Sequence, residues 1–299
     1  MSKTVYHGCL SNQKMLDHVM RSLEWLFREI PSLGGISIET SDTGVCQCAE
    51  CRKHRTMPAN MISYDDMARY YPKAIETVLS VNPNAKVICE TYSHFLPKMI
   101  KTPASFCNGI TEEAAQVLSA IPKEAYLSWV ADRMIRTEWT EEDTLPSVLQ
   151  GHHHIMRGHY GTYWEGSKRH KLEVWSIRKM CRLSAITDMN RISLFGECSP
   201  YNTNNELNYL AGIYFSKNPM ASMEDFRRDV AAEMLGSYEA SGLYLHINEQ
   251  LNDKNYDTDY MDVIADCITS STGDVRRRWV WFASYYASII WDEEHNLTK

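Results

Sequence analysis

The sequence predicts an α/β protein of the TIM-type (β/α) barrel class, in a partial form, with an all-helical region after it. Two observations carry this prediction. Short apolar strand segments alternate with helical segments up to about residue 204, and every later segment has helical spacing. Such an alternation favours parallel βαβ units with right-handed crossovers. We therefore expect a barrel portion over residues 1–204 and a helical region over residues 205–299 that packs on the barrel.

The elements of the barrel portion follow one another in a regular order. The first predicted helix runs from Ser11 to Ile30 and ends at Pro31, and the second opens at Ser63 with Asp66 as a capping-box-like partner. A closed barrel of this class has eight strands, but only six are predicted here. Either the sheet is open, or two further strands come from outside this sequence. The six predicted strands are Thr4 to Leu10, Gly34 to Glu39, Lys86 to Tyr92, Ala125 to Val130, His153 to Tyr160 and Arg191 to Glu197.

The segments after residue 204 are predicted to be helices that form a packed layer. They lie around residues 205–217, 222–235, 238–251 and 259–292. The last segment is rich in aromatic residues at helical spacing, a pattern that is more typical of a hydrophobic core than of a ligand platform.

Composition excludes several classes of protein. The 299 residues are 44% hydrophobic and 23% charged, as in ordinary globular proteins, and the net charge of -7 disfavours a nucleic-acid partner. No apolar run reaches the roughly 20 residues needed to span a bilayer, and the N-terminus lacks the apolar core of a signal peptide. We therefore expect a cytoplasmic protein without a membrane or nucleic-acid partner. The sequence does not indicate the oligomeric state.

Acidic and aromatic residues gather where the predicted strands end. Ligands of parallel α/β folds bind at the carboxyl ends of the strands. Carboxylates there can perform acid/base chemistry, and aromatic rings can stack on sugars, so the pattern predicts a carbohydrate substrate. A helix cap or a solvated charge would explain any single acid, but acids end five strands. The candidate residues are His7, Asn12, Glu39, Asp42, Glu90, Tyr92, Trp129, Asp132, Tyr160, Tyr163, Trp164, Glu165, Glu197 and Tyr201.

Glu39 is the leading candidate for the catalytic carboxylate. It ends a short strand that begins with two glycines, and Asp42 follows in the loop, where a second carboxylate can assist the first or orient a substrate group. The alternative interpretation of Glu39 is a helix-capping partner or a salt bridge in the loop.

A cysteine-rich loop follows this strand. Cys46, Cys48 and Cys51, with His54, could complete a tetrahedral structural zinc site, although the spacing is not that of a standard zinc finger. A disulfide within the loop and free thiols are the alternatives. The other six cysteines are expected to be buried, reduced thiols, and they are Cys9, Cys89, Cys107, Cys181, Cys198 and Cys267.

A histidine cluster falls in the fifth predicted strand. Because alternate residues of a strand face the same side, His152 and His154 are expected to share one face, with His153 on the other and His159 farther along. Hydrogen bonding to a sugar or to the backbone is favoured over metal ligation. Glycine-rich phosphate loops, serine nucleophile elbows and dinucleotide fingerprints are absent from the sequence.

Three stretches resemble bacterial barrel enzymes in the neighbourhood of glycoside hydrolase families 20 and 163. The first is Gly34 to Asp42 with the cysteine loop after it. The second is Cys9 to Asn12, which resembles a Cys-Pro-Ser-Asn motif with Leu10 in place of proline. The third comprises Phe195 to Glu197, Asn205 to Leu210, and Asn218-Pro219. The similarity spans most of residues 5–245.

The resemblance implies that the six strands correspond to barrel strands three to eight and that the first two lie outside this sequence. Glu39 would then end the fourth strand, where such enzymes carry their acid/base residue. Family 20 has Asp-Glu at this position, whereas Ile38 precedes Glu39 here. This difference argues against the substrate-assisted mechanism of that family.

The resulting hypothesis is a glycosidase of carbohydrate metabolism that cleaves a glycan containing N-acetylhexosamine or uronate. Glu39 would be the general acid and Asp42, Asp132 or Glu165 the second carboxylate, and no cofactor would be required beyond a structural zinc ion. One alternative is a non-catalytic glycan-binding or scaffold protein derived from a barrel hydrolase, and another is a metal-dependent hydrolase centred on the cysteines and histidines. The predicted sugar platform consists of Trp129, Tyr160, Tyr163 and Trp164.

Overall fold

The computed structural model describes most of the chain, which divides into two compact units. Unit 1 comprises residues 1–157 and 186–191, and unit 2 comprises residues 158–185 and 192–299. The described residues are 8–39, 44–56, 58–59, 62–94, 112–130, 147–160, 170–186, 189, 191–196 and 202–295.

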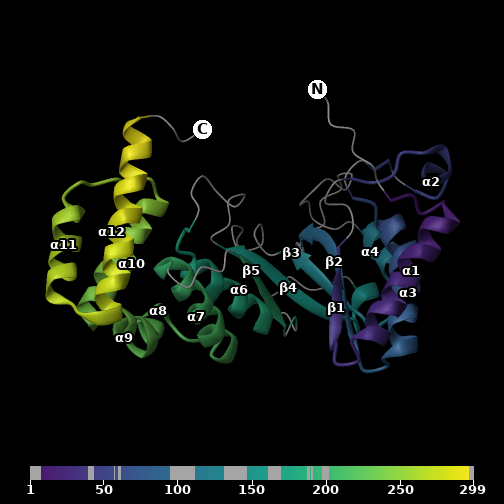
Figure 1. The fold of residues 1–299 in the computed structure, drawn as a ribbon, viewed down its shortest axis with the longest axis horizontal. Coiled ribbons are helices and arrows are strands. Elements are labelled where there is room, and N and C mark those ends of the chain that lie inside the picture. The colour runs from purple at the N-terminus through teal and green to yellow at the C-terminus, as the bar shows by residue number, and fades with distance from the viewer. Residues whose placement is uncertain are drawn as a thin grey trace. The chain divides into compact units, whose positions relative to one another are not determined.

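The described strands form one five-stranded sheet in the order β1-β2-β3-β4-β5 (Figure 1). The pairs β1–β2, β2–β3 and β3–β4 are parallel, as the alternation of strands and helices predicts, with Ile38 opposite Cys89 at the end of β1. The strands are β1 (Gly35–Ile38), β2 (Lys86–His94), β3 (Tyr126–Val130), β4 (His153–Tyr160) and β5 (Ile192–Gly196).

The prediction of a TIM-type barrel with six strands is wrong. The described part of the chain carries five strands in an open order that runs from β1 to β5. The predicted first strand, Thr4 to Leu10, falls mainly on residues 1–7, outside the described residues, and Gly8 to Leu10 are not strand. Local patterns locate each strand, but they do not encode whether the first strand pairs with the last, which is what closes a barrel.

The two long helices of unit 1 begin close to their predicted starts, and Ser63 is the cap predicted for the second of them. The side chain of Asn12 accepts a hydrogen bond from the Met15 N–H and starts α1, and Ser63 does the same for Asp66 at the start of α3. The buried stripe of α1 consists of Leu16, Leu23 and Phe27. The helices are α1 (Gln13–Glu29), α2 (Ala49–Lys53), α3 (Tyr64–Val81), α4 (Glu112–Leu118) and the short η1 (Ser147–Leu149).

The backbones of β1 and β2 approach each other closely at Gly35. A Cβ atom built on Gly35 would collide with the carbonyl oxygen of Lys86, its partner in the register. Any side chain would force the two strands apart, so the glycine is needed for this pairing.

Unit 2 is mostly helical. The predicted segment 222–235 is divided by a π-helical turn. The segment 259–292 is two helices separated at Ser271 and Thr272, because the backbone at Ser271 is extended, with a φ of -110° and a ψ of 163°. Its helices are α6 (Val174–Ile186), α7 (Thr203–Lys217), α8 (Met223–Phe226), η3 (Arg227–Ala231), α9 (Ala232–Leu235), α10 (Tyr238–Asn252), α11 (Tyr260–Ser270) and α12 (Gly273–Glu294).

The aromatic residues of α12 form the core of the helical region, as predicted from their spacing. Trp279, Phe282 and Tyr286 are buried, and the Phe282 ring contacts both of the others. The Trp279 indole N–H donates to the Leu235 carbonyl oxygen at 3.1 Å. Trp281 and Tyr285 are partly buried, and Trp291 is 53% exposed. In the described ranges, no helix combines the length and the apolar character needed to cross a membrane.

Candidate functional site

The carboxylate of Glu39 lies at the carboxyl end of β1 and contacts residues of two other strands. Its Oε2 accepts a hydrogen bond from the Tyr92 hydroxyl of β2 at 2.9 Å, and its Oε1 lies 3.1 Å from Nη1 of Arg157 on β4. The Glu39 side chain is 44% exposed, whereas the Arg157 side chain is 6% exposed. The site therefore offers one solvent-accessible carboxylate that is held by a buried cation and a phenol.

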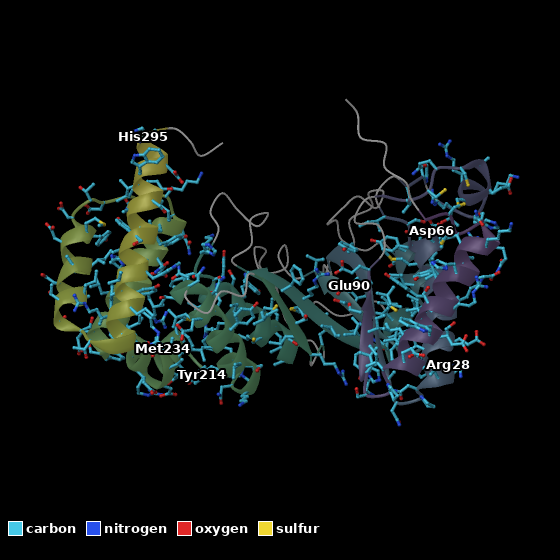
Figure 2. All side chains as sticks on the ribbon, in the orientation of Figure 1. Arg28, Asp66, Glu90, Tyr214, Met234 and His295 are labelled. Atoms are coloured by element: carbon cyan, nitrogen blue, oxygen red, sulfur yellow. The ribbon has the colours of Figure 1, made fainter. Side chains whose placement is uncertain are left out.

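Arg157 connects Glu39 to a second carboxylate. Its Nη1 also lies 3.0 Å from Oε2 of Glu90, which is buried on β2 (labelled in Figure 2). Burial by itself would lower the pKa of Arg157, but the carboxylates of Glu90 and Glu39 outweigh it and raise that pKa above its usual value. Arg157 therefore stays charged, and a buried charge of this kind requires its partners.

The backbone at Tyr92 is strained. Tyr92 has a φ of 53°, and the pairing of β2 with β3 shifts register between Glu90 and His94. A bulky residue in this left-handed region costs on the order of 1–3 kcal/mol and persists only where the surrounding structure enforces it. Here the unusual conformation accompanies the hydrogen bond from the Tyr92 hydroxyl to Glu39.

Tyr71 of α3 bonds to the backbone of both β1 and β2. Its hydroxyl lies 2.6 Å from the Glu90 carbonyl oxygen and 3.3 Å from that of Ile38, and its ring is fully buried. These carbonyls belong to Glu90 itself and to the residue before Glu39. Tyr71 therefore positions the backbone of both carboxylates, a role that its place in the apolar stripe of α3 does not reveal.

Glu39, Glu90 and Tyr92 are the predicted site residues that the structure brings together. Asn12 has a different task, because it caps α1. Six predicted residues fall outside the described ones, so their roles stay predictions, and these are Asp42, Asp132, Tyr163, Trp164, Glu165 and Glu197. His7, Tyr201 and the side chain of His159 also fall outside.

Two residues of the predicted sugar platform are buried. Trp129 is completely buried, and its indole N–H donates to Nδ1 of His154 at 3.0 Å. In unit 2, Tyr160 is buried as well, and its hydroxyl donates to Sδ of Met180. A buried ring has no free face for a sugar, so both predictions need correction: these aromatic rings pack in the interior.

The histidines at the start of β4 alternate as predicted, and two of them bond to the backbone. His152 lies 2.9 Å from the carbonyl oxygen of Ile121, and His154 lies 3.0 Å from that of Leu149, whereas His153 stacks on Tyr126 on the other face. Burial lowers the pKa of His154 to about 4, which keeps its ring neutral. The structure assigns these histidines to the packing of unit 1.

The neutral His154 predicts a pH dependence of stability. The usual pKa of 6.5 applies to the unfolded chain and a pKa of about 4 to the folded chain, so between these values the unfolded state binds more protons. The free energy of unfolding should therefore fall as the pH drops from 6.5 towards 4, by up to about 3 kcal/mol from this residue. Urea denaturation at several pH values checks this, and a His154→Gln variant should show a shallower slope. An equal slope in the variant would contradict the assignment.

Four cysteines come together in unit 1. The sulfur atoms of Cys9, Cys46, Cys48 and Cys51 all lie within 4.8 Å of one another, and Cys9 is 3.7 Å from both Cys48 and Cys51. All four are free thiols, so the alternative of a disulfide in the loop is not what the structure shows. The cluster can hold a metal ion.

The fourth member of the cysteine cluster differs from the prediction. The sequence suggested His54 as the fourth ligand because it lies close to the three cysteines. His54 is instead exposed at the end of α2, and Cys9 is the fourth residue of the cluster. Cys9 comes from the segment before α1, a contact that the spacing of the loop could not indicate. Cys89 and Cys181 are buried free thiols, as expected.

The thiols of the cluster are electrostatically unequal. Cys48 precedes α2, and its sulfur accepts a hydrogen bond from the Cys51 N–H at 3.4 Å. This bond, followed by the contact with Cys46, lowers the pKa of Cys48 to about 7, while burial raises that of Cys46 to about 12. The backbone geometry therefore already favours one thiolate.

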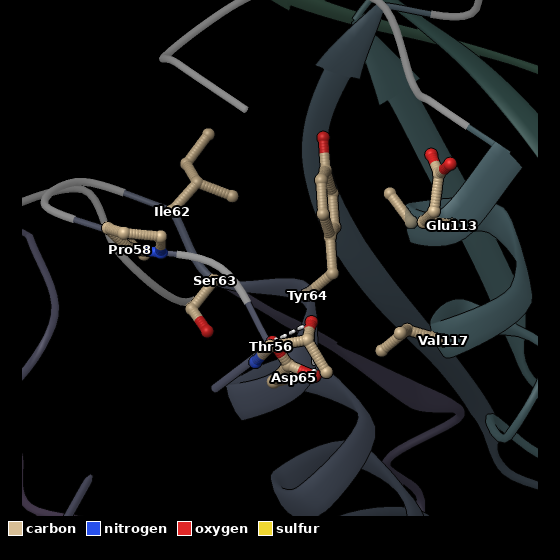
Figure 3. A pocket seen from close by; sticks show the side chains of 10 residues that line it. Thr56, Pro58, Ile62, Ser63, Tyr64, Asp65, Glu113 and Val117 are labelled. Carbon is tan, nitrogen blue, oxygen red and sulfur yellow. Dashed lines mark hydrogen bonds between the residues drawn. The ribbon is translucent and has the colours of Figure 1, made fainter. Parts of the chain in front are cut away.

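Two cavities in the described residues are larger than about 10 Å³, and both lie away from Glu39 and the cysteine cluster. A small one of about 30 Å³ lies at the start of α3, where Thr56 bonds to Asp65 (Figure 3). A larger one of about 370 Å³ lies in unit 2 between the starts of α10 and α12 and is lined by hydroxyl groups and Trp279. Neither contains Glu39 or a residue of the cysteine cluster.

Comparison with known proteins gives no relative of this chain. No protein-family model, no curated protein and no solved structure matches it.

Proposed function

We propose that this protein hydrolyses a glycosidic bond and that Glu39 is the carboxylate that acts on the sugar. The observation that carries the proposal is the exposed Glu39 carboxylate, held by the Tyr92 hydroxyl and the buried Arg157 at the carboxyl end of β1. This is the edge of a parallel sheet at which ligands bind, and glycoside hydrolysis uses a pair of accessible carboxyl groups, of which Glu39 would be one.

The neighbours of Glu39 favour its action as a carboxylate over the general-acid role expected from the sequence. Glu39 accepts a hydrogen bond from the Tyr92 hydroxyl and forms an ion pair with Arg157, whose guanidinium has no acceptor atom, so neither neighbour favours a protonated Glu39. An accepting carboxylate suits attack on the anomeric carbon, or removal of a proton from the attacking water. The proton for the leaving oxygen would then come from a second carboxyl group, for which Asp42, Asp132 and Glu165 are the candidates.

The substrate class in this proposal is a glycan that contains N-acetylhexosamine or uronate. Its support is the resemblance of Gly34 to Asp42 and of the cysteine loop to glycoside hydrolase families 20 and 163. The configuration of the released sugar would distinguish attack by Glu39, which retains configuration, from attack by water, which inverts it.

The reaction itself needs no metal in this proposal. We propose a zinc ion as the occupant of the cysteine cluster, with a structural role, because four thiolates suit zinc and leave no open position for a substrate.

A panel of 4-nitrophenyl glycosides and natural oligosaccharides tests the function. We expect release of nitrophenol, or of free sugar, from at least one N-acetylhexosaminide or uronide. Binding of glycans without cleavage would favour the non-catalytic alternative. A different result would favour the metal-dependent hydrolase and exclude the role of Glu39. In that case a chelator would abolish cleavage, and added zinc would restore it even in a Glu39→Gln variant.

A further inference from the structure

We infer that Cys9 completes a closed four-thiolate zinc site with Cys46, Cys48 and Cys51, and that the bound ion fastens the segment before α1 to the loop after β1. This inference concerns the ligand set and its structural role. It does not depend on the glycosidase proposal.

The separations of the sulfur atoms match the size of a zinc–thiolate tetrahedron. Four sulfurs, each about 2.3 Å from a central zinc ion, lie about 3.8 Å from one another. Cys9 is 3.7 Å from Cys48 and from Cys51, and no pair in the cluster exceeds 4.8 Å. A disulfide would bring two sulfurs to about 2.05 Å, so the cluster has the spacing of ligands around an ion rather than of a bond.

The surrounding contacts fix the ligands in place. The Cys51 N–H points at the Cys48 sulfur, and the Ser11 hydroxyl lies 3.3 Å from the Cys51 sulfur. The guanidinium of Arg55 donates to the Cys46 carbonyl oxygen at 2.7 Å and forms an ion pair with Asp66 of α3 at 2.6 Å. Both members of this pair are largely buried, so the pair anchors the cysteine loop to α3.

The ligand set implies a closed structural site. Zinc with four thiolates carries no water and has no open position, so the site does not activate a substrate. Binding converts up to four thiols to thiolates and releases their protons to the buffer, with no change of oxidation state. Cys9 is separated from Cys46 by β1 and α1, so one ion joins two distant parts of unit 1.

The ion should also stabilise the loop that follows Glu39. Cys46 follows Glu39 by seven residues in the sequence, and Cys51 is buried in α2. Removal of the metal would release the loop from the segment before α1. The loop should then exchange its amide hydrogens faster over residues 44–55.

Metal analysis of untagged protein tests the ligand set. We expect one zinc ion per chain, released by a mercurial that blocks thiols, and a cobalt-substituted form with the absorption bands of tetrahedral thiolate ligation. Cys9→Ser should lower the zinc affinity at least tenfold, whereas His54→Ala and Cys267→Ser, which alter residues outside the cluster, should keep full zinc content. Circular dichroism shows whether the Cys9→Ser chain remains folded.

Three results would overturn the inference. The first is wild-type protein that binds no zinc after reduction and reconstitution, a result that needs no variant. The second is loss of zinc in His54→Ala with retention in Cys9→Ser, and the third is iron in place of zinc. Unchanged hydrogen exchange over residues 44–55 after chelation would contradict the fastening role. None of these measurements uses glycosidase activity, so a failure of the zinc inference can be distinguished from a failure of the proposed function.

Discussion

Replacing Glu39 with glutamine is expected to lower kcat for glycoside hydrolysis by about 10²–10⁴-fold. The glutamine has the same size, and its carbonyl oxygen can still accept from the Tyr92 hydroxyl, but it can neither attack the anomeric carbon nor take a proton from water. The Glu39 side chain is 44% exposed, so the substitution should not disturb the core. Steady-state kinetics on the best substrate of the panel, with circular dichroism to confirm folding, measures the effect.

The matched control for this variant is Glu24→Gln. Glu24 forms an exposed pair with Arg28 at 2.6 Å on α1 and is not part of the site. It should keep wild-type kcat and KM. Near-normal turnover in Glu39→Gln would show that Glu39 is not the catalytic carboxylate.

Replacing Arg157 with methionine is expected to destabilise the protein by about 3–5 kcal/mol. The Arg157 and Glu90 side chains are each 6% exposed, so removing the cation leaves a buried carboxylate without its charged partner. Methionine fills much of the same space, which limits the contribution of a cavity. Urea denaturation followed by fluorescence measures the free energy of unfolding.

An exposed pair and a double variant show whether burial causes the effect. Arg28→Met breaks the exposed pair on α1 and should cost less than about 1 kcal/mol. The double variant Arg157→Met/Glu90→Met removes both buried charges and should recover much of the loss of the single variant. Equal losses in Arg157→Met and Arg28→Met would contradict the structural role of Arg157.

Local features of the fold were predictable because local chemistry determines them. Asn12 and Ser63 cap their helices through their own side chains, so a few adjacent residues determine where each helix starts. Strand positions follow from short apolar runs in the same way. Closure of the sheet into a barrel depends instead on pairing between distant strands, and that part of the prediction was wrong.

The candidate site was predictable only in part for the same reason. The carboxyl ends of neighbouring parallel strands share one edge, so Glu39, Glu90 and Tyr92 could be grouped from the sequence. Arg157 was missed, although a lone arginine in a strand that is otherwise buried needs a counter-charge nearby. Cys9 was missed because only the packing of the segment before α1 brings it to the cysteine loop.

Chemical rescue of a Glu39→Ala variant tests the central claim most directly. The variant is incubated with a 4-nitrophenyl glycoside that the wild-type protein cleaves, with and without sodium azide. If Glu39 is the catalytic carboxylate, azide should enter the vacated space and bond to the anomeric carbon as nitrophenolate leaves, so that turnover rises and a glycosyl azide forms. Turnover close to wild type without azide, or no glycosyl azide from a folded variant at any azide concentration, would contradict the role of Glu39.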